Sequence, residues 1–144
     1  MQRPGLRIST DPAELDISMI HGYLAGESYW ARGISRSLLE RALANSFCFG
    51  GFVDERQVAF ARVVTDRATF AHLKDVFVLP AYRGRRYGVA LVERILAHPE
   101  LRSVTMTLAT ADAHGLYRRF GFGEPDQPGH QMIRPGSFLS PQGG

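Results

Sequence analysis

A loop rich in arginine and glycine is the part of the sequence best suited to bind a ligand. Residues 83–88 read Arg-Gly-Arg-Arg-Tyr-Gly, shortly after the apolar segment 76–79 and just before apolar residues at helical spacing. The first N–H groups of a helix are unpaired and carry a partial positive charge, and glycines let the chain approach a ligand closely. Arginines at the rim add charge-assisted hydrogen bonds. The loop therefore predicts an anion site, with a pyrophosphate as the expected ligand.

Two other interpretations of this loop stay open. Its glycines could serve only the geometry of a solvated turn, or its arginines could bind nucleic acid. A net charge of +3, from 17 basic and 14 acidic residues, is too small for a dedicated nucleic-acid binder. The spacing also differs from the nucleotide-binding patterns G-x-G-x-x-G and G-x-x-x-x-G-K. We expect no nucleic-acid partner.

Length and composition indicate one ordinary globular domain. The chain has 144 residues and a mass of 16.0 kDa, with 44% hydrophobic and 22% charged residues, which leaves no room for a second core. Its one cysteine, Cys48, excludes an internal disulfide and fits a reducing compartment. No apolar run approaches the roughly 20 residues of a membrane span, and none follows the N-terminus as in a signal peptide. We expect a cytoplasmic protein without a membrane partner.

Turn and capping residues divide the chain into helices and strands. Asp11 begins a capping box, Ser35 is a candidate N-cap, and Gly26 and Gly121 are candidate helix ends. The expected elements are helices over 11–26 and 35–45, strands over 46–53, 58–64 and 69–79, a helix over 88–96, a strand over 104–108, a helix over 112–120 and a strand over 131–134. A meander that leads through a helix into a further strand predicts an α+β, or mixed α/β, single domain.

Two motifs together resemble those of a known enzyme family. Residues 83–88 resemble the acetyl-CoA-binding motif of the GCN5-related N-acetyltransferases (GNAT), written Q/R-x-x-G-x-G/A. The segment 113–122, Ala-His-Gly-Leu-Tyr-Arg-Arg-Phe-Gly-Phe, is similar to the family's later motif of an alanine, a tyrosine four residues on, and Gly-Phe. The resemblance covers about residues 6–135. One departure is Arg86, which stands where the pattern normally has glycine and could crowd the cofactor or add a positive charge to it.

The resemblance implies a fold and a co-substrate. It implies a mostly antiparallel, splayed sheet flanked by helices, in which the strand over 75–79 diverges from the strand over 104–109. Acetyl-CoA would lie in that cleft, with its pantetheine arm on the backbone of the first strand and its pyrophosphate on the loop amides, and no metal is required. The residues expected to bind acetyl-CoA are Val76, Phe77, Val78, Arg83, Gly84, Arg85, Arg86, Tyr87 and Gly88.

Tyr117 and Asp75 are the expected catalytic residues. Tyr117 occupies the motif position that commonly protonates the departing coenzyme A thiolate, and a phenol with a pKa of about 10 suits that role. Its alternative is a structural tyrosine of the helix core. Asp75 is the expected general base, because apolar surroundings favour the protonated form of a carboxyl group. An ion pair with Arg62 is the alternative for Asp75, and His72, His114 or a relay through water are weaker candidates for the base.

Tyr29 and Trp30 are the expected acceptor-binding residues. They lie in the loop between the first two helices, where family members tend to build the acceptor pocket, and two aromatics can form a wall for a cationic or apolar group. The alternative is that the pair anchors its loop to the core. Cys48 is expected to be an unreactive core thiol, and the five histidines lack the spacing of metal ligands.

The sequence thus indicates an acyl-CoA-dependent N-acetyltransferase. It would move an acetyl group to the primary amine of a small molecule or peptide, by direct attack in a ternary complex. The alternative is a non-catalytic module that binds or senses acyl-CoA, suggested by Arg86. One N-acetyltransferase domain is expected over residues 1–144, with a core over about 6–135 and a flexible tail over 136–144. The resemblance also implies a homodimer as an option, because family members often dimerise through sheet edges or C-terminal strands.

Overall fold

The centre of the molecule is an antiparallel meander of three long strands. In the computed structural model, which describes residues 5–139, these are β2 (Phe47–Val53), β3 (Arg56–Thr65) and β4 (Phe70–Val78). Aromatic and β-branched residues supply half of their buried side chains, and such residues are favoured in strands. The Asp66 carboxylate accepts the N–H groups of Ala68 and Thr69 and closes the turn before β4. The meander expected from the sequence is confirmed.

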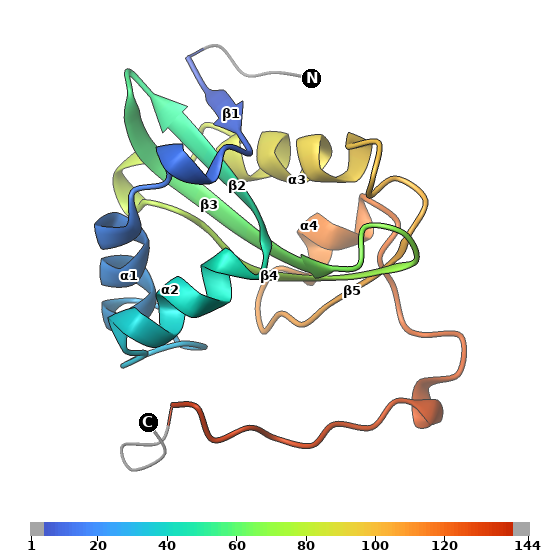
Figure 1. Cartoon of the computed structure of the whole chain (residues 1–144). Coiled ribbons are helices and arrows are strands. Elements are labelled where there is room, and N and C mark those ends of the chain that lie inside the picture. Colours follow the sequence, from blue (N-terminus) through green and yellow to red (C-terminus); the bar gives the residue numbers. More distant parts are fainter. Residues whose placement is uncertain (1–4, 140–144) are drawn as a thin grey trace.

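Two short strands complete the sheet, which has the order β1-β2-β3-β4-β5 (Figure 1). β1 (Arg7–Ser9) pairs antiparallel with β2, whereas β5 (Thr105–Leu108) pairs parallel with β4. A parallel partner needs a crossover, which the chain makes through α3 (Tyr87–Ala97). The fold is the single-domain α+β fold with a mostly antiparallel sheet that the sequence predicts.

Helices cover both faces of the sheet (Figure 1). On one face, α1 (Ile17–Gly26) and α2 (Arg36–Ala44) bury their apolar sides in a cluster that includes Phe60 and Phe77. On the other face, α3 and α4 (His114–Arg118) pack in a second cluster that includes Tyr117. The sheet therefore separates two apolar cores, and the crossover helix and the tyrosine motif lie on the same side.

One helix start differs from the expectation. The capping box at Asp11 closes a single 3₁₀ turn over Pro12–Glu14, and Leu15 then has an extended backbone with ψ 133°. The helix α1 begins at Ile17, where Asp16 is the N-cap and accepts a backbone N–H of the first turn. At α2 the expected cap is confirmed, because the Ser35 side chain accepts a backbone N–H three residues on.

The C-terminal part of the chain departs most from the sequence prediction. The strand expected over 131–134 does not form, since these residues lie in no strand and have no partner on the sheet. Phe122 is the last residue packed against a core cluster, and residues 123–139 are exposed. Of the tail expected over 136–144, residues 140–144 lie outside the described part. Within residues 5–139, the helices are all too short or too polar to cross a membrane.

Candidate active site

A β-bulge on β4 fixes the position of the expected catalytic carboxylate. Asp75 and Val76 on β4 together lie opposite one residue of β3, Ala61. Asp75 has a φ of 55°, in the left-handed region that aspartate adopts more readily than most residues. The extra residue bends β4 at this point, and the Asp75 side chain is buried beside the bend.

Next to the bulge, β4 and β5 separate and leave a cavity between them. Their parallel pairing ends at Leu73 and Leu108, while β4 continues along β3 to Val78. A cavity with a volume of about 420 Å³ lies where the strands part. The splayed sheet implied by the family resemblance is therefore present. The residues expected to act in catalysis and acceptor binding all line this cavity, although they come from three parts of the chain: Tyr29 and Trp30, Asp75, and Tyr117.

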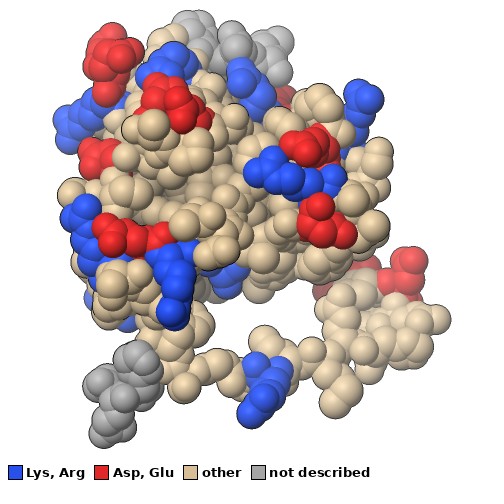
Figure 2. Space-filling model, in the orientation of Figure 1, with Lys and Arg blue, Asp and Glu red and all other residues tan. Residues whose placement is uncertain are grey.

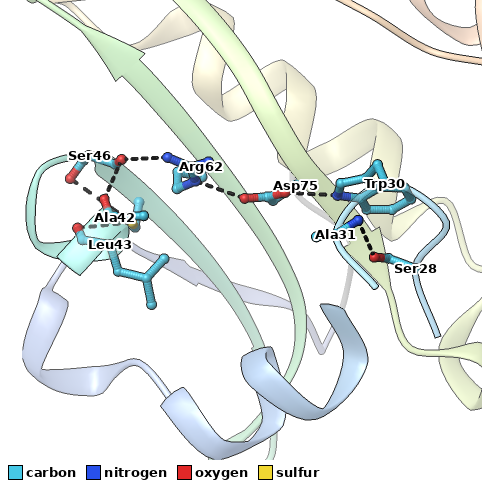
Figure 3. Close-up of polar contacts among 9 residues, drawn as sticks. Ser28, Trp30, Ala31, Ala42, Leu43, Ser46, Arg62 and Asp75 are labelled. Atoms are coloured by element: carbon cyan, nitrogen blue, oxygen red, sulfur yellow. Dashed lines mark hydrogen bonds and ion pairs between the residues drawn. The ribbon is translucent and has the colours of Figure 1, made fainter. Parts of the chain in front are cut away.

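Both oxygens of the Asp75 carboxylate accept hydrogen bonds (Figure 3). The Arg62 guanidinium donates from Nε to Oδ2 at 2.8 Å, and the Trp30 indole donates from Nε1 to Oδ1 at 2.8 Å. Arg62 is held in turn by Ser46, whose hydroxyl accepts from Nη1 at 3.1 Å. The Asp75 and Arg62 side chains are 5% and 13% exposed, so this ion pair is largely removed from water. The ion pair that the sequence offers as the alternative to a base is thus formed.

Tyr29 and Trp30 bridge the two walls of the cavity. Their rings meet edge to face, with centroids 5.0 Å apart. Trp30 is bonded to Asp75 on β4, whereas the Tyr29 hydroxyl accepts the N–H of Ala111, beyond β5, at 3.2 Å. Buried Ser28 fixes their loop by donating to a carbonyl oxygen of α1. The pair therefore anchors its loop and also forms a wall of the cavity.

Tyr117, on the short helix α4, also lines the cavity. Its side chain is 8% exposed, and its ring meets that of Phe122 nearly edge to face at 5.9 Å. Burial raises the pKa of Tyr117 above its ordinary value of about 10, and the nearby Asp112 adds to the shift. The phenol therefore keeps its proton at neutral pH and is suited to donate it.

His72 is a further titratable group on the cavity wall. Its Nδ1 lies 2.6 Å from Thr107 Oγ1, so a hydrogen bond across the β4–β5 pair holds the ring. Burial lowers the pKa of His72 below its ordinary value, helped by the positive charges of Lys74 and Arg62. The imidazole is thus neutral at pH 7 and can accept a proton. Sequence reasoning ranks His72 below Asp75 and misses Thr107, because neither lies in a motif and only strand register brings them together.

The outer edge of β4 offers backbone groups to a ligand. Leu79 N–H donates to Val58 O at 2.8 Å, so the backbone of Leu79, and of Phe77 two residues earlier, faces β3. The intervening residues Val76 and Val78 direct their N–H and C=O groups away from β3, beyond the end of the β5 pairing. Of the three strand residues expected to bind acetyl-CoA, these two have outward backbone groups.

The loop before α3 has an unusual backbone at two positions. Gly84 and Arg86 have positive φ values of 83° and 61°. The left-handed backbone at Arg86 gives a physical reason for glycine in the family pattern. A residue with a side chain adopts this conformation at a cost of about 1 kcal/mol, whereas glycine does not. Arg86 is the N-cap of α3 and its side chain makes no capping bond, which leaves the first N–H groups of the helix for a ligand.

Two of the loop arginines contact the body of the protein. Arg83 donates from Nε to Val78 O and from Nη2 to the Tyr23 hydroxyl, both at 2.9 Å. The guanidinium carbon of Arg85 lies 5.2 Å from the centroid of the Tyr82 ring. Arg83 thus covers one of the outward carbonyl groups of β4, and a ligand that pairs with that carbonyl must displace it.

Two other residues considered in the sequence lie away from the cavity lining. Cys48 is buried, and burial raises the pKa of its thiol to about 11, so it is a poor nucleophile at neutral pH. His114 lines a different groove, beside β5. Neither residue borders the cavity that contains Asp75 and Tyr117.

Comparison with known sequences decides the family. The sequence profile described as "Acetyltransferase (GNAT) domain" matches residues 44–124, more than half of the chain. The chain belongs to the GNAT acetyltransferase family. A candidate acetyltransferase of Gibberella zeae is 32% identical over 137 aligned residues, which cover 79% of this chain and 77% of that relative. Membership supports acyl-CoA-dependent acetyl transfer as the general activity of this GNAT protein.

Solved structures share the fold of this GNAT protein. A candidate GNAT acetyltransferase from Xanthomonas campestris pv. campestris is 50% identical, with a TM-score of 0.92 over 97% of this chain and 99% of that one. A GNAT acetyltransferase from Elizabethkingia anophelis, solved with acetyl-CoA bound, has a TM-score of 0.64 at 16% identity, over 86% of this chain and 80% of that one. At this low identity the second likeness concerns the fold alone.

Proposed function

We propose that this GNAT protein transfers an acetyl group from acetyl-CoA to a primary amine in the cavity between β4 and β5. The observation that carries the proposal is the meeting of a buried carboxylate, a neutral imidazole and a protonated phenol around one cavity where the two strands part. These groups can hold an ammonium, accept a proton and donate a proton. Direct transfer to an amine needs those three functions.

The residues present fit acetyl-CoA. The outward backbone groups of Val76 and Val78 can pair with an extended amide chain such as pantetheine. The N–H groups at the start of α3 and the guanidinium groups of Arg85 and Arg86 can bind the phosphates. Arg83 would leave the carbonyl of Val78 and turn toward the same phosphates. The acetyl group would then lie near the end of the β4–β5 pairing.

The proposal divides the acid and base functions among three residues. The Asp75 carboxylate has acceptor capacity beyond its bonds to Arg62 and Trp30, and it holds the acceptor as an ammonium beside the Trp30 ring. His72 takes the proton from that ammonium, because its imidazole is neutral, whereas both oxygens of Asp75 already accept hydrogen bonds from Arg62 and Trp30. The neutral amine attacks the thioester carbonyl, and Tyr117 donates its proton to the departing thiolate. The second proton that the attacking nitrogen loses on forming the amide restores the phenol. Asp75 is thus proposed as the anchor of the acceptor and His72 as the base.

Release of free coenzyme A thiol from acetyl-CoA, measured against a panel of primary amines and short peptides, tests this proposal. We expect at least one amine to stimulate release, with the acetylated amine confirmed by mass spectrometry. A hydrolytic background that no amine stimulates, together with intact binding of acetyl-CoA, would favour the second candidate function. That candidate is a non-catalytic acyl-CoA-binding module, and the observation that favours it is the strained backbone of Arg86 in the phosphate loop.

A further inference from the structure

Lys74 is the only lysine in this GNAT protein, and it lines the cavity between β4 and β5. The other 16 of the 17 residues counted as lysine or arginine are arginines. A guanidinium group stays protonated in proteins and is therefore a poor nucleophile, whereas lysine carries a primary amine on a flexible four-carbon stem. The cavity in which the proposed function places an external primary amine thus already contains one.

Strand register places Lys74 on the face of the sheet from which an acceptor is bound. Lys74 lies directly opposite Arg62 of β3, and opposite residues direct their side chains to the same face. His72 is two residues earlier on β4 and shares that face. Leu73, between them, packs on the other face in the cluster of α3. Lys74 therefore reaches the cavity from the side of α1, α2 and the Trp30 loop.

The expected base is close to the Lys74 amine. Burial lowers the pKa of His72, and the positive charge of Lys74 lowers it further, so the ammonium and the imidazole interact. A hydrogen bond with Thr107 on β5 holds the imidazole at the cavity wall. The neutral imidazole is thus placed to take a proton from the lysine.

The expected acid reaches the same cavity from the other face of the sheet. Tyr117 belongs to the cluster of α3 and α4, and it lines the cavity at the end of the pairing between β4 and β5. The loop before α3, which is proposed to bind the phosphates of acetyl-CoA, borders that face as well. An acetyl group at the end of the β4–β5 pairing would therefore lie between Lys74 and Tyr117.

Lys74 has no counter-charge within residues 5–139. In the cavity the Asp75 carboxylate pairs with Arg62 (Figure 3), and the described carboxylates form no ion pair with Lys74. Surface arginines differ, because Figure 2 shows basic and acidic side chains beside one another, and three exposed ion pairs join Arg7 to Glu14, Arg36 to Glu40 and Arg67 to Glu100. Like charges directly opposite each other destabilise a strand pair, so loss of the Lys74 charge would relieve its repulsion with Arg62.

We propose that Lys74 is acetylated by its own active site, so that a chain without an acceptor transfers one acetyl group from acetyl-CoA to its own lysine. This inference rests on the proposed function. His72 takes a proton from the Lys74 ammonium, and the lone pair of Nζ attacks the thioester carbonyl. The C–N bond forms, the C–S bond breaks, and coenzyme A leaves as a thiol with the proton of Tyr117. The second proton lost by the nitrogen restores the phenol, so the products are acetylated Lys74, coenzyme A thiol and one released proton.

The modification would limit acetylation of external amines. Acetylation replaces an ammonium with a larger neutral amide in a cavity of about 420 Å³. Lys74 is adjacent to Asp75, the carboxylate that is proposed to hold the acceptor. The acetylated side chain would therefore compete with the acceptor for the same end of the cavity.

Intact mass spectrometry of the full chain incubated with acetyl-CoA alone tests the proposal, with peptide mapping to locate the acetyl group. We expect one acetyl group on Lys74, at a rate per chain that is independent of protein concentration. Protein unfolded in guanidinium chloride should react at least about 100-fold more slowly, because no cavity holds the amine and the thioester together. Lys74→Arg keeps the positive charge and should abolish the modification, with circular dichroism to check its fold.

A pair of histidine variants separates catalysis by the site from chemical acetylation. His72→Gln should slow the acetylation of Lys74 by about 100-fold. The matched control is His130→Gln, in an exposed segment outside the cavity lining, which should leave the rate unchanged. Equal rates in folded and unfolded protein, or in His72→Gln and the unmodified protein, would overturn the proposal. A rate per chain that rises with protein concentration would show transfer between copies and would also overturn it.

Two further outcomes distinguish this inference from the proposed function. An unmodified Lys74 in protein that acetylates an added amine would overturn self-acetylation and leave the proposed function intact. An unmodified Lys74 in protein that binds acetyl-CoA but acetylates no amine of the panel would contradict both.

Discussion

The indole N–H of Trp30 donates to the carboxylate of Asp75 at 2.8 Å, between residues 45 positions apart in the sequence. This bond fastens the loop after α1 to the bulge of β4, and Arg62 holds the other oxygen of the same carboxylate. One buried charged group therefore positions the aromatic wall of the cavity and presents negative charge to it. Stability and acceptor binding should both depend on Asp75.

Loss of the Asp75 carboxylate should destabilise the fold. Asp75→Ala leaves the Arg62 guanidinium, which is 13% exposed, without its counter-charge, and we expect the free energy of unfolding to fall by about 3 kcal/mol. The control is Glu40→Ala, which breaks an ion pair with Arg36 whose side chains are about half exposed; it should cost less than about 0.5 kcal/mol. Urea denaturation measures both values. Similar small losses in the two variants would show that the Asp75 pair contributes little.

Removal of the Trp30 donor should weaken acceptor binding. Trp30→Phe keeps an aromatic ring but deletes the hydrogen bond to Asp75, so we expect the KM for the amine to rise by about tenfold with the affinity for acetyl-CoA unchanged. Tyr29→Phe is the matched control, since it deletes the hydroxyl that accepts from Ala111 N–H and keeps the bond between Trp30 and Asp75. Steady-state kinetics with a saturating second substrate give both constants. An equal effect on the KM for acetyl-CoA would contradict the assignment.

The phenol of Tyr117 should be needed for turnover and not for coenzyme binding. Tyr117→Phe should lower kcat by about 100-fold, in the range typical of a lost general acid, while the ring stays packed against Phe122. Because burial raises the pKa of Tyr117, its proton is retained up to about pH 10, and Tyr117 should cause no loss of activity below that pH. A pH–kcat profile and acetyl-CoA binding of both proteins check this. Unchanged kcat in the variant removes Tyr117 from the mechanism.

The acid limb of the pH profile should belong to His72. Its pKa is lowered by burial, so kcat at saturating amine should stay constant down to about pH 6.5 and fall below it as the imidazole becomes protonated. His72→Gln should lower kcat and remove this limb, whereas Asp75→Asn should raise the KM for the amine and keep the limb. Profiles from pH 5 to 9 of the three proteins separate the roles. A fall in kcat at low pH that persists in His72→Gln and vanishes in Asp75→Asn would show that Asp75, and not His72, is the general base.

The charge of Arg86 should strengthen coenzyme binding. Its backbone already has the left-handed conformation that glycine would adopt, and its side chain is exposed. Arg86→Gly should therefore leave the thermal midpoint nearly unchanged. Glycine relieves the backbone strain of the folded state, but it also raises the conformational entropy of the unfolded chain, and the two effects offset each other. The affinity for coenzyme A should fall by about fivefold and depend less on salt. Tighter binding by Arg86→Gly would show that the side chain crowds the site.

Most elements of the fold could be predicted from the sequence, because local signals define them. The spacing of apolar residues and the positions of turn residues predict the meander, the Ser35 cap and the helix α3. The start of α1 could not, because Asp11 and Asp16 are equally good caps and only the backbone at Leu15 decides between them. The strand expected over 131–134 does not form, because these residues have no partner on the sheet.

The candidate site could be predicted in part. The loop and the Tyr117 motif are local patterns, and the pairing of Asp75 with Arg62 follows from neighbouring strands. The bond between Trp30 and Asp75 and the contact between His72 and Thr107 depend on how distant segments pack. No spacing in the sequence encodes those contacts, so sequence reasoning could name the residues but not their partners.

Calorimetric titration of the purified protein with acetyl-CoA tests whether the protein binds its expected co-substrate, with coenzyme A and ATP titrated in parallel. We expect micromolar binding of acetyl-CoA and of coenzyme A, weakened by Arg86→Gly, and no comparable binding of ATP. Absence of binding to either coenzyme form would contradict the claim that the loop before α3 and the cleft between β4 and β5 form an acetyl-CoA site.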